Sequence, residues 1–347
     1  MIDLRSDTLS MPCKEMLQTI LSASLGDDGR VGVDGKGEDA TVNELEYMAA
    51  ELTGKESALI MNSGTMANTV ALVTHCTAGD KVLLDPLQHT YRTEKIAFDK
   101  NFGQLQPIFY DLTKEGLPCL TSVKEHLQKE SIKLLCVENT HNSLGGKALP
   151  LDMLQKIRDI ADTADIPVHM DGARLFNAAL ALKTSVKEIC KYPDTLMFCL
   201  SKGLGAPIGA VLCGSREFID KARGQRKLLG GNMRQAGIIA APGIYALQNN
   251  VQGLQIDHDN ASLLAKGLSD LQVLHVVAEP ESNIVMLDTF DTGLTATEVA
   301  NLLKKAGLWV LTSGDRQVRL VFYRGITHEM TVQAIEIVKT VDRELKK

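Results

Sequence analysis

Short apolar runs alternate with helical stretches through the first two-thirds of the chain, and this alternation constrains the fold more than any other feature. Strands that alternate with helices predict a largely parallel sheet covered by helices on both faces. Helices are predicted where apolar residues recur at a spacing of three or four. The apolar runs lie at residues 57–61, 81–85, 105–110, 133–138, 167–170, 195–200 and 208–213, and helices are predicted at 12–24, 39–53, 65–76, 120–130 and 151–164.

The pattern changes after residue 213, where helices dominate and shorter strands follow them. A chain of 347 residues exceeds the roughly 250–300 residues that one hydrophobic core usually organises. We therefore predict a large domain at 1–250, including the N-terminal segment, and a small α+β domain at 251–347. In this second part, helices are predicted at 215–228, 236–250, 254–269, 295–306 and 328–345, and strands at 271–277, 283–288, 308–311 and 317–322.

Charge and cysteine usage exclude several classes of protein. The chain has 37 Lys and Arg against 43 Asp and Glu, a formal charge of −6, which argues against nucleic-acid and membrane-surface partners because both need a basic field. No run of about 18 apolar residues predicts a membrane span, and the N-terminus lacks the apolar core of a signal peptide. The seven cysteines are scattered without a CxxC pair, which favours a reducing, cytoplasmic location.

Lys202 lies between the apolar strand TLMFCLS and a glycine-rich turn, in the segment LSKGLGAPIG (200–209). A lysine that is partly desolvated at the end of a strand can lose its proton and attack an aldehyde. Taken alone, a solvated loop lysine is the more common case. The glycine spacing differs from that of a dinucleotide-binding fingerprint.

Asp171 ends another apolar strand, in VHMDGAR (168–174), 31 residues before Lys202. In an open parallel sheet the two side chains would emerge at the same edge, where ligands bind. A carboxylate at the end of a buried strand needs a positive partner, and a protonated pyridine nitrogen is such a partner. The alternative is a helix N-cap.

The segment NSGTMAN (62–68) joins the strand at 57–61 to a predicted helix. Backbone N–H groups at a helix N-terminus, with hydroxyls and a glycine for close approach, form a phosphate site. An ordinary cap explains the hydroxyls but leaves the glycine unexplained. A phosphate site, an acid for a ring nitrogen and a nucleophilic lysine together indicate pyridoxal 5′-phosphate (PLP) held by Lys202 as an imine.

The chain resembles the L-threonine aldolases of the PLP fold-type I (aspartate aminotransferase-like) superfamily. The motifs that carry the resemblance are RSDT (5–8), SGTMAN (63–68), ENTHN (138–142), VHMDGAR, LSKGLGAPIG, GGNMRQAG (230–237), DHDNA (257–261) and VRLV (318–321). The resemblance implies an α/β fold with a mainly parallel seven-stranded sheet, helices on both faces and a smaller C-terminal α+β domain. It also implies a carbon–carbon lyase that cleaves L-threonine or L-allo-threonine to glycine and acetaldehyde, assembled as a homotetramer with sites at dimer interfaces.

The same resemblance assigns cofactor roles to individual residues. Lys202 would form the imine, Asp171 would pair with the pyridinium nitrogen, and His89 would stack on the ring. Arg234 would reach the phosphate from its own or a neighbouring subunit. The complete set of cofactor contacts implied is Ser63, Gly64, Thr65, His89, Asp171, Arg174, Ser201, Lys202 and Arg234.

For the substrate, the resemblance implies that Ser6, Arg174 and Arg319 receive the carboxylate, which suits the planar fork of arginine. His141 would lie near the substrate hydroxyl. His89, His141 or an ordered water is the candidate base, because the pKa of histidine suits proton transfer near neutrality. By position alone, Arg319 could face outward from its strand, and His141 could be a turn residue. No metal ion is expected, because adjacent residues of DHD on a helix cannot all face one ion.

Two segments depart from the family pattern. The stretch GRVGVDGKGEDAT (29–41), part of a glycine-rich loop at 26–39, is longer than its family counterpart, and SLGG (143–146) is an insertion. Both would lie at the rim of the active site, where they affect side-chain specificity. The alternatives are therefore β-elimination, transamination, or an aldolase for phenylserine or β-hydroxyaspartate. A non-catalytic PLP carrier is disfavoured by the intact candidate residues, and a Rossmann oxidoreductase by the missing GxGxxG.

Overall fold

A seven-stranded sheet forms the centre of the computed structural model, which describes residues 1–346. Its strands are β2 (Ser57–Met61), β3 (Lys81–Leu84), β4 (Gln106–Phe109), β5 (Ile132–Glu138), β6 (Val168–Asp171), β7 (Thr195–Cys199) and β8 (Ala210–Gly214). They lie in the order β2-β8-β7-β6-β5-β3-β4. Neighbours pair in parallel except around β8, which is antiparallel to β2 and β7. Each of the seven predicted apolar runs forms one of these strands, so the predicted mainly parallel sheet is confirmed.

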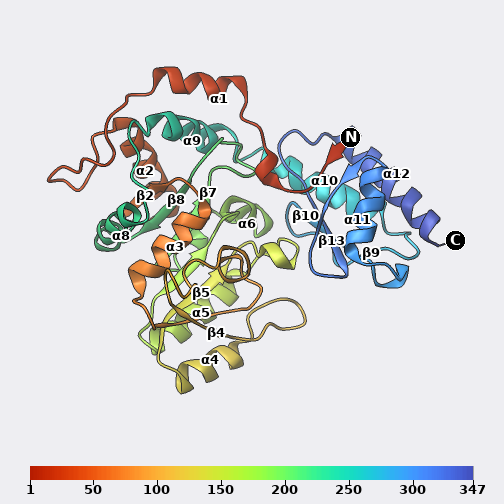
Figure 1. Ribbon diagram of the computed structural model, residues 1–347, viewed down its shortest axis with the longest axis horizontal. Helices are drawn as coiled ribbons and strands as arrows, with labels where there is room; N and C mark the ends of the chain where they lie inside the picture. The colour runs from red at the N-terminus through yellow and green to blue at the C-terminus, as the bar shows by residue number, and fades with distance from the viewer. Residues whose placement is uncertain (347) are drawn as a thin grey trace.

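Helices cover both faces of this sheet (Figure 1). Successive side chains of a strand point to opposite faces, and Ile60 packs on one face while Leu59 packs on the other. Helices α3 (Gly64–His75) and α8 (Arg216–Leu228) pack on the face of Leu59. The opposite face is covered by α2 (Ala40–Thr53), α4 (Leu120–Lys129), α5 (Leu151–Thr163), α6 (Leu175–Ala181), α7 (Val186–Ile189) and α9 (Gly237–Asn249).

Local signals explain where α2 begins and ends. Asp39 accepts a hydrogen bond from Val42 N at 3.0 Å, and Gly54 ends the helix with φ 68°, a left-handed conformation that glycine adopts easily. The helix predicted at 12–24 is wrong in length, because α1 covers only Lys14–Gln18 and a 3-10 turn follows it. Met16 is the one buried residue of α1 and that turn, so little packing supports a longer helix.

A second, antiparallel sheet lies in the C-terminal part of the chain. It has the strand order β12-β13-β10-β9, and its own apolar core includes Leu287, Val318 and Leu320. The strand predicted at 271–277 shortens to two residues, and the one at 308–311 divides in two. The helices and strands of this C-terminal part are β9 (His275–Val276), β10 (Ile284–Asp288), β11 (Leu308–Trp309), β12 (Leu311–Thr312), β13 (Gln317–Val321), α10 (Leu254–Gly267), α11 (Ala296–Lys305) and α12 (His328–Leu345).

The N-terminal segment joins the two sheet systems. Strand β1 (Ile2–Asp3) pairs in parallel with β11, and Leu4 is fully buried in the smaller core. The chain then crosses to the larger part and continues into α1, which lies beside α9 (Figure 1). The first residues therefore pack with the C-terminal part, although we grouped them with the large domain; the division near residue 250 remains our proposal. None of the helices within residues 1–346 is both long and apolar enough to span a bilayer.

Candidate active site

A cavity of about 350 Å³ opens where β6 and β7 end beside the N-terminus of α3. Its volume falls within the range of small-molecule sites, about 300–1,000 Å³. Seven of the predicted site residues line it: Ser63, Gly64, Thr65, His89, Asp171, Ser201 and Lys202. The lining also includes Thr8, Asn62, Asn68, Glu94, Ala173, Met197, Cys199, Pro207 and Ile208.

The N-terminus of α3 forms one end of the cavity. Ser63 Oγ accepts a hydrogen bond from Met66 N at 3.1 Å, so this serine is a helix cap as well as a lining residue. The backbone N–H groups of Gly64 and Thr65 lie in the first turn of α3, where no carbonyl of the helix accepts from them. A Cβ on Gly64 would lie 2.9 Å from Cys199 Sγ, which explains the glycine. This end can receive an anion at backbone N–H groups with the helix dipole behind them.

Asp171 and Lys202 enter the cavity from the ends of neighbouring strands. Asp171 is 2% exposed, and its carboxylate accepts from Asn68 Nδ2 at 2.9 Å and from Ala173 N at 3.0 Å. It does not cap a helix, because the N-cap of α6 is Arg174. Lys202 Nζ makes no hydrogen bond or ion pair within residues 1–346.

These groups fit PLP. The start of α3 can hold the phosphate, the Asp171 carboxylate can face a pyridinium nitrogen, and the unpaired Lys202 amine can meet the aldehyde. Gly64, where a Cβ would not fit, lies at the end of the cavity that can receive an anion. Ser201 lines the same cavity next to Lys202.

Two residues of one segment bring further ionisable groups to the cavity. His89 precedes a π-helical turn, Thr90–Glu94, and burial lowers the pKa of its imidazole, although Asp171 partly opposes this shift. Glu94, which the sequence did not indicate, ends the turn with its side chain 5% exposed and lies 3.9 Å from His89 Nε2. Burial and the charge of Asp171 raise the pKa of Glu94 to about 8. The cavity therefore holds a neutral imidazole and a protonated carboxyl at neutral pH.

The two predicted arginines lie beside one another but differ in their partners. Arg174 binds the buried carboxylate of Asp7 twice, at 2.6 and 2.8 Å. Asn142 Oδ1 accepts from Arg174 Nη1 at 3.0 Å and from Arg319 Nη1 at 2.8 Å. Arg319 forms no ion pair within the described chain, and burial together with Arg174 lowers its pKa to about 10. Arg319 is thus the uncompensated cation, whereas Asp7 neutralises Arg174.

His141 lies apart from the cavity surface. Its ring is buried, and Nε2 lies 3.2 Å from Asp85 Oδ1. Burial alone would lower the pKa of His141, but Glu138 and Asp85 outweigh it and raise the pKa. The ring is therefore buried and held against Asp85, an arrangement that suits a structural role better than that of a base.

Ser6 and Arg234 do not line the cavity of their own chain. Ser6 Oγ accepts from Thr8 N at 3.2 Å and from Thr8 Oγ1 at 2.8 Å, and Thr8 is the residue that reaches the cavity. The Arg234 side chain is 69% exposed and pairs with Asp27. A contact between Arg234 and the cofactor therefore requires a second copy of the chain or a movement of this segment.

The glycine-rich loop at 26–39 is anchored by a buried ion pair. Asp28, which is fully buried, binds Arg226 at 2.6 Å, and Arg223 lies 3.3 Å from the same carboxylate. The loop thus packs on α8, although the sequence indicated little core for it to bury.

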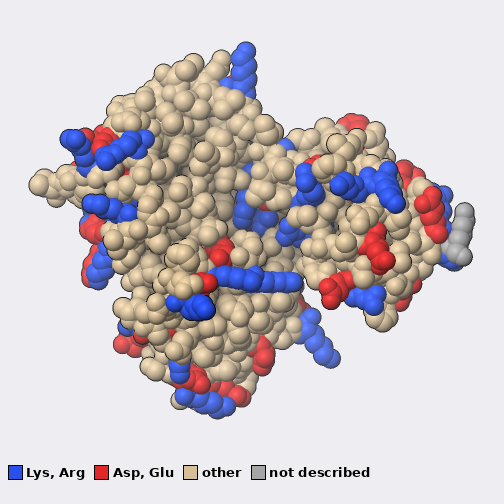
Figure 2. All heavy atoms as spheres, viewed as in Figure 1, with Lys and Arg blue, Asp and Glu red and all other residues tan. Residues whose placement is uncertain are grey.

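Figure 2 shows basic side chains gathered where the large and small parts meet, on the face that it presents.

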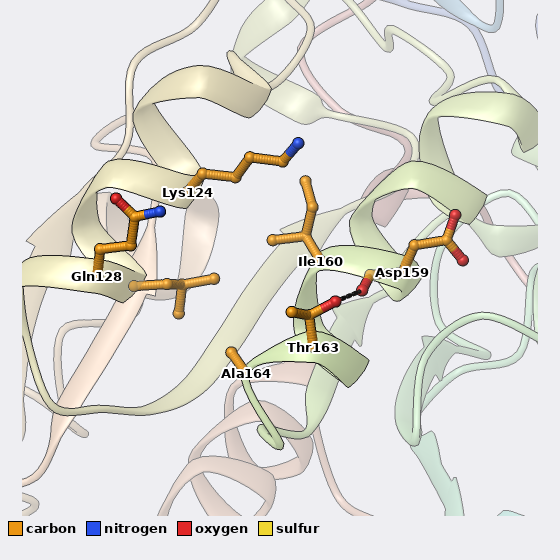
Figure 3. A pocket seen from close by; sticks show the side chains of 7 residues that line it. Lys124, Gln128, Asp159, Ile160, Thr163 and Ala164 are labelled. Atoms are coloured by element: carbon orange, nitrogen blue, oxygen red, sulfur yellow. Dashed lines mark hydrogen bonds between the residues drawn. The ribbon is translucent and has the colours of Figure 1, made fainter.

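A second groove lies on the outer layer of helices. Lys124 and Gln128 of α4 face Ile160 and Thr163 of α5 across a space of about 410 Å³ (Figure 3). It contains none of the predicted site residues. Seven of those residues line the cavity at Lys202 instead.

Comparison with known proteins identifies the family. Residues 3–292 match the family model described as beta-eliminating lyase. The chain belongs to the beta-eliminating lyase family. Membership of this family implies a PLP-dependent enzyme, in agreement with the donors that line the cavity.

Two known proteins and one solved structure are similar to the chain over nearly its whole length. The low specificity L-threonine aldolase of Escherichia coli K12 is 43% identical, over 96% of this chain and 97% of that protein. Low-specificity L-threonine aldolase 1 of Arabidopsis thaliana is 36% identical over 94% and 92%. A threonine aldolase structure from Leishmania major has the same fold, with a TM-score of 0.80 over 99% of this chain and 100% of that chain at 17% identity.

Proposed function

We propose that this chain is an L-threonine aldolase that uses PLP to cleave L-threonine or L-allo-threonine to glycine and acetaldehyde. The observation that carries the proposal is one cavity that combines an unpaired Lys202, the buried carboxylate of Asp171 and the open N-terminus of α3. Relatives that share 36–43% of their residues with this chain are named for the same reaction.

The residues that would hold PLP are those at the two ends of the cavity. Gly64 and Thr65 would donate backbone N–H groups to the phosphate, and Asp171 would pair with the ring nitrogen. Lys202 would hold the cofactor through its aldehyde group. The bound cofactor supplies an electron sink for the bond that breaks between Cα and Cβ.

Arg319 is the residue that we assign to the substrate carboxylate. It carries the uncompensated charge, whereas Asp7 occupies two donors of Arg174. Asn142 accepts from both arginines and so fixes their spacing. The role of Arg174 in this scheme is to orient Asn142 rather than to carry the carboxylate alone.

His89 is our candidate for the base that takes the proton of the β-hydroxyl. It lines the cavity, and its lowered pKa leaves the ring neutral and able to accept a proton at pH 7. His141 is buried against Asp85, and the neighbouring carboxylates raise its pKa. This contact would help to hold Asp85 and the segment that carries Asn142 in place.

Product analysis tests the reaction. The purified protein is incubated with PLP and with L-threonine, L-allo-threonine or phenylserine, and glycine, aldehyde, ammonia and keto acid are measured. Glycine and aldehyde in equal amounts support an aldolase, and the substrate that reacts fastest identifies the side chain it prefers. Ammonia with a keto acid would instead assign the chain to β-elimination.

Lys202→Ala tests the attachment of the cofactor. We expect loss of the near-ultraviolet or visible absorption of the protein-bound imine and of aldehyde release, whereas Lys221→Ala, at an exposed position of α8, should behave as the wild type. Retention of both the absorption band and turnover in Lys202→Ala would exclude this lysine.

We also propose a homotetramer built from dimers, in which Arg234 of one copy approaches the phosphate of another. The exposure of Arg234 and its position outside the cavity of its own chain support this arrangement. Light scattering of the purified protein gives the mass of the assembly, and a monomer with full activity would contradict the proposal.

A further inference from the structure

A line of polar side chains runs behind Asp171, away from the cavity. His75 Nε2 lies 2.8 Å from Thr195 Oγ1, which lies 3.0 Å from His169 Nδ1. His169 Nε2 lies 3.3 Å from Asn68 Oδ1, and Asn68 Nδ2 lies 2.9 Å from Asp171 Oδ2. Four consecutive contacts therefore connect α3, β7 and β6 to the carboxylate at the cavity.

The chemistry of the groups fixes the direction of these hydrogen bonds. Asn68 Nδ2 faces Asp171 and also Glu94, at 3.2 Å, so the donor end of the amide meets the two acids and its oxygen meets His169. The amide oxygen can only accept, which places the His169 proton on Nε2. Nδ1 of that ring then accepts from the Thr195 hydroxyl, whose oxygen accepts from His75. Every donor in the line points toward Asp171.

Both histidines are neutral in this arrangement. Burial lowers the pKa of His169 to about 3 and that of His75 to about 4. A neutral ring has one donor and one acceptor nitrogen, as the line requires. The line therefore supplies aligned dipoles but no positive charge. None of its groups neutralises Asp171, which can pair with a cation in the cavity.

We propose that Asn68 is a positioning residue that holds the carboxylate of Asp171 aimed at the ring nitrogen of the cofactor, with His169 and Thr195 fixing the orientation of its amide. Asp171 is buried and has two N–H donors, of which Asn68 is the one from another element. Hydrogen bonds to an ionised acceptor are stronger than neutral ones, and a linear network polarises its members. This inference rests on the proposed function, because the ring nitrogen belongs to PLP.

The test measures the cofactor in Asn68→Leu, which removes the donor at similar volume. PLP labelled with ¹⁵N at the ring is bound to the protein, and the ¹⁵N resonance reports protonation of that nitrogen. We expect the resonance of Asn68→Leu to move toward the unprotonated form, and the Kd for PLP to rise about 10- to 100-fold, as for loss of a charge-assisted hydrogen bond. Asn177→Leu, which removes a similarly buried amide that bonds His258, should leave both values unchanged.

A second variant separates this role from a purely steric one. Thr195→Val keeps the shape of the residue behind His169 and should move the resonance and the Kd in the same direction by a smaller factor. This near-isosteric change carries the test if Asn68→Leu does not fold.

A protonated ring nitrogen and a Kd within twofold of wild type in Asn68→Leu, or in Thr195→Val if Asn68→Leu does not fold, would overturn the inference. Failure of the wild-type protein to bind PLP through Lys202 is a different result, because it contradicts the proposed function itself.

Discussion

At the scale of single residues, the candidate site depends on which charges are already paired. Arg174 and Arg319 look alike in the sequence, yet Asp7 neutralises the first and leaves the second available. Among the acids, Asp171 receives two N–H donors, whereas burial keeps Glu94 protonated. Neighbouring groups of one chemical type thus have different functions because their partners differ.

Arg319→Leu should weaken the use of substrate by removing a charge-assisted contact with its carboxylate. We expect kcat/KM for L-threonine to fall about 10- to 100-fold, mainly through KM, while the Kd for PLP changes little. Arg316→Leu, an exposed arginine one residue before the same strand, is the control. An unchanged KM in Arg319→Leu would remove this residue from the proposed carboxylate site.

Glu94 predicts a dependence of stability on pH. In the unfolded chain this carboxyl ionises near 4.5, whereas in the fold its pKa is about 8, so folding takes up a proton between these values. The native protein therefore loses stability as the pH rises from 4.5 to 8, with no effect below that window. Glu94→Gln removes the loss, so the Tm of the PLP-free variant should rise relative to wild type by a few degrees between pH 5 and pH 8.

Calorimetry at a series of pH values checks this prediction. Glu336→Gln, at an exposed position of α12, should follow the wild type throughout. A Tm difference for Glu94→Gln that stays constant from pH 5 to pH 8 would contradict the raised pKa.

At the scale of elements, the start of α3 carries most of the site. One turn provides the cap at Ser63, the free N–H groups of Gly64 and Thr65, and, three residues later, the amide of Asn68. The helix packs against β7, so its N-terminus lies beside the strand that precedes Lys202. A small shift of this helix would therefore disturb both the phosphate end and the ring-nitrogen end of the site.

Gly64→Ala should produce such a shift. The added Cβ would lie 2.9 Å from Cys199 Sγ and 3.2 Å from Met197 Cε, so the first turn must move away from β7. We expect the Kd for PLP to rise roughly tenfold, in line with the usual cost of overpacking. Titration of the PLP-free protein measures it. The control is Gly224→Ala in α8, where a Cβ meets nothing within 4 Å and should not weaken binding.

At the scale of the whole molecule, segments far apart in the sequence complete the site. Asp7 lies 167 residues from Arg174, and the N-terminal segment that carries it is fixed on the C-terminal part of the chain by the pairing of β1 with β11. Arg319 lies on β13, in the antiparallel sheet of that same part. The carboxylate site that we propose therefore depends on how the smaller part packs against the larger one.

The loop at 26–39 belongs to this scale as well. Its base is fixed by Asp28 and Arg226, whereas Val31 and Val33 at its tip are 48% and 112% exposed. Exposed apolar side chains favour contact with another copy. Replacing both valines with serine should lower the mass measured by light scattering, and Phe102→Ser, which removes an exposed apolar residue elsewhere, should not. An unchanged mass would exclude this tip from the interface.

Much of this protein could be predicted from local sequence. The seven apolar runs gave the seven strands, and apolar spacing gave the helix at 39–53, because such patterns act within a few residues. The α1 helix was predicted too long, since its length depends on packing that a local pattern does not contain. Asn68 and Glu94 could not be identified, because a polar residue in a helix or a turn shows its role only when a distant acid lies against it.

The sequence by itself determined the mainly parallel sheet, the family resemblance and the order of the phosphate, acid and lysine motifs, because each is encoded by neighbouring residues. The tertiary structure decided which histidine lines the cavity, which arginine lacks an ion-pair partner within the described residues, and which amide holds Asp171. These are properties of burial and of charges brought together from distant parts of the chain. The pKa of a group and the pairing of a charge depend on what surrounds them in space, and only the packed fold provides those surroundings.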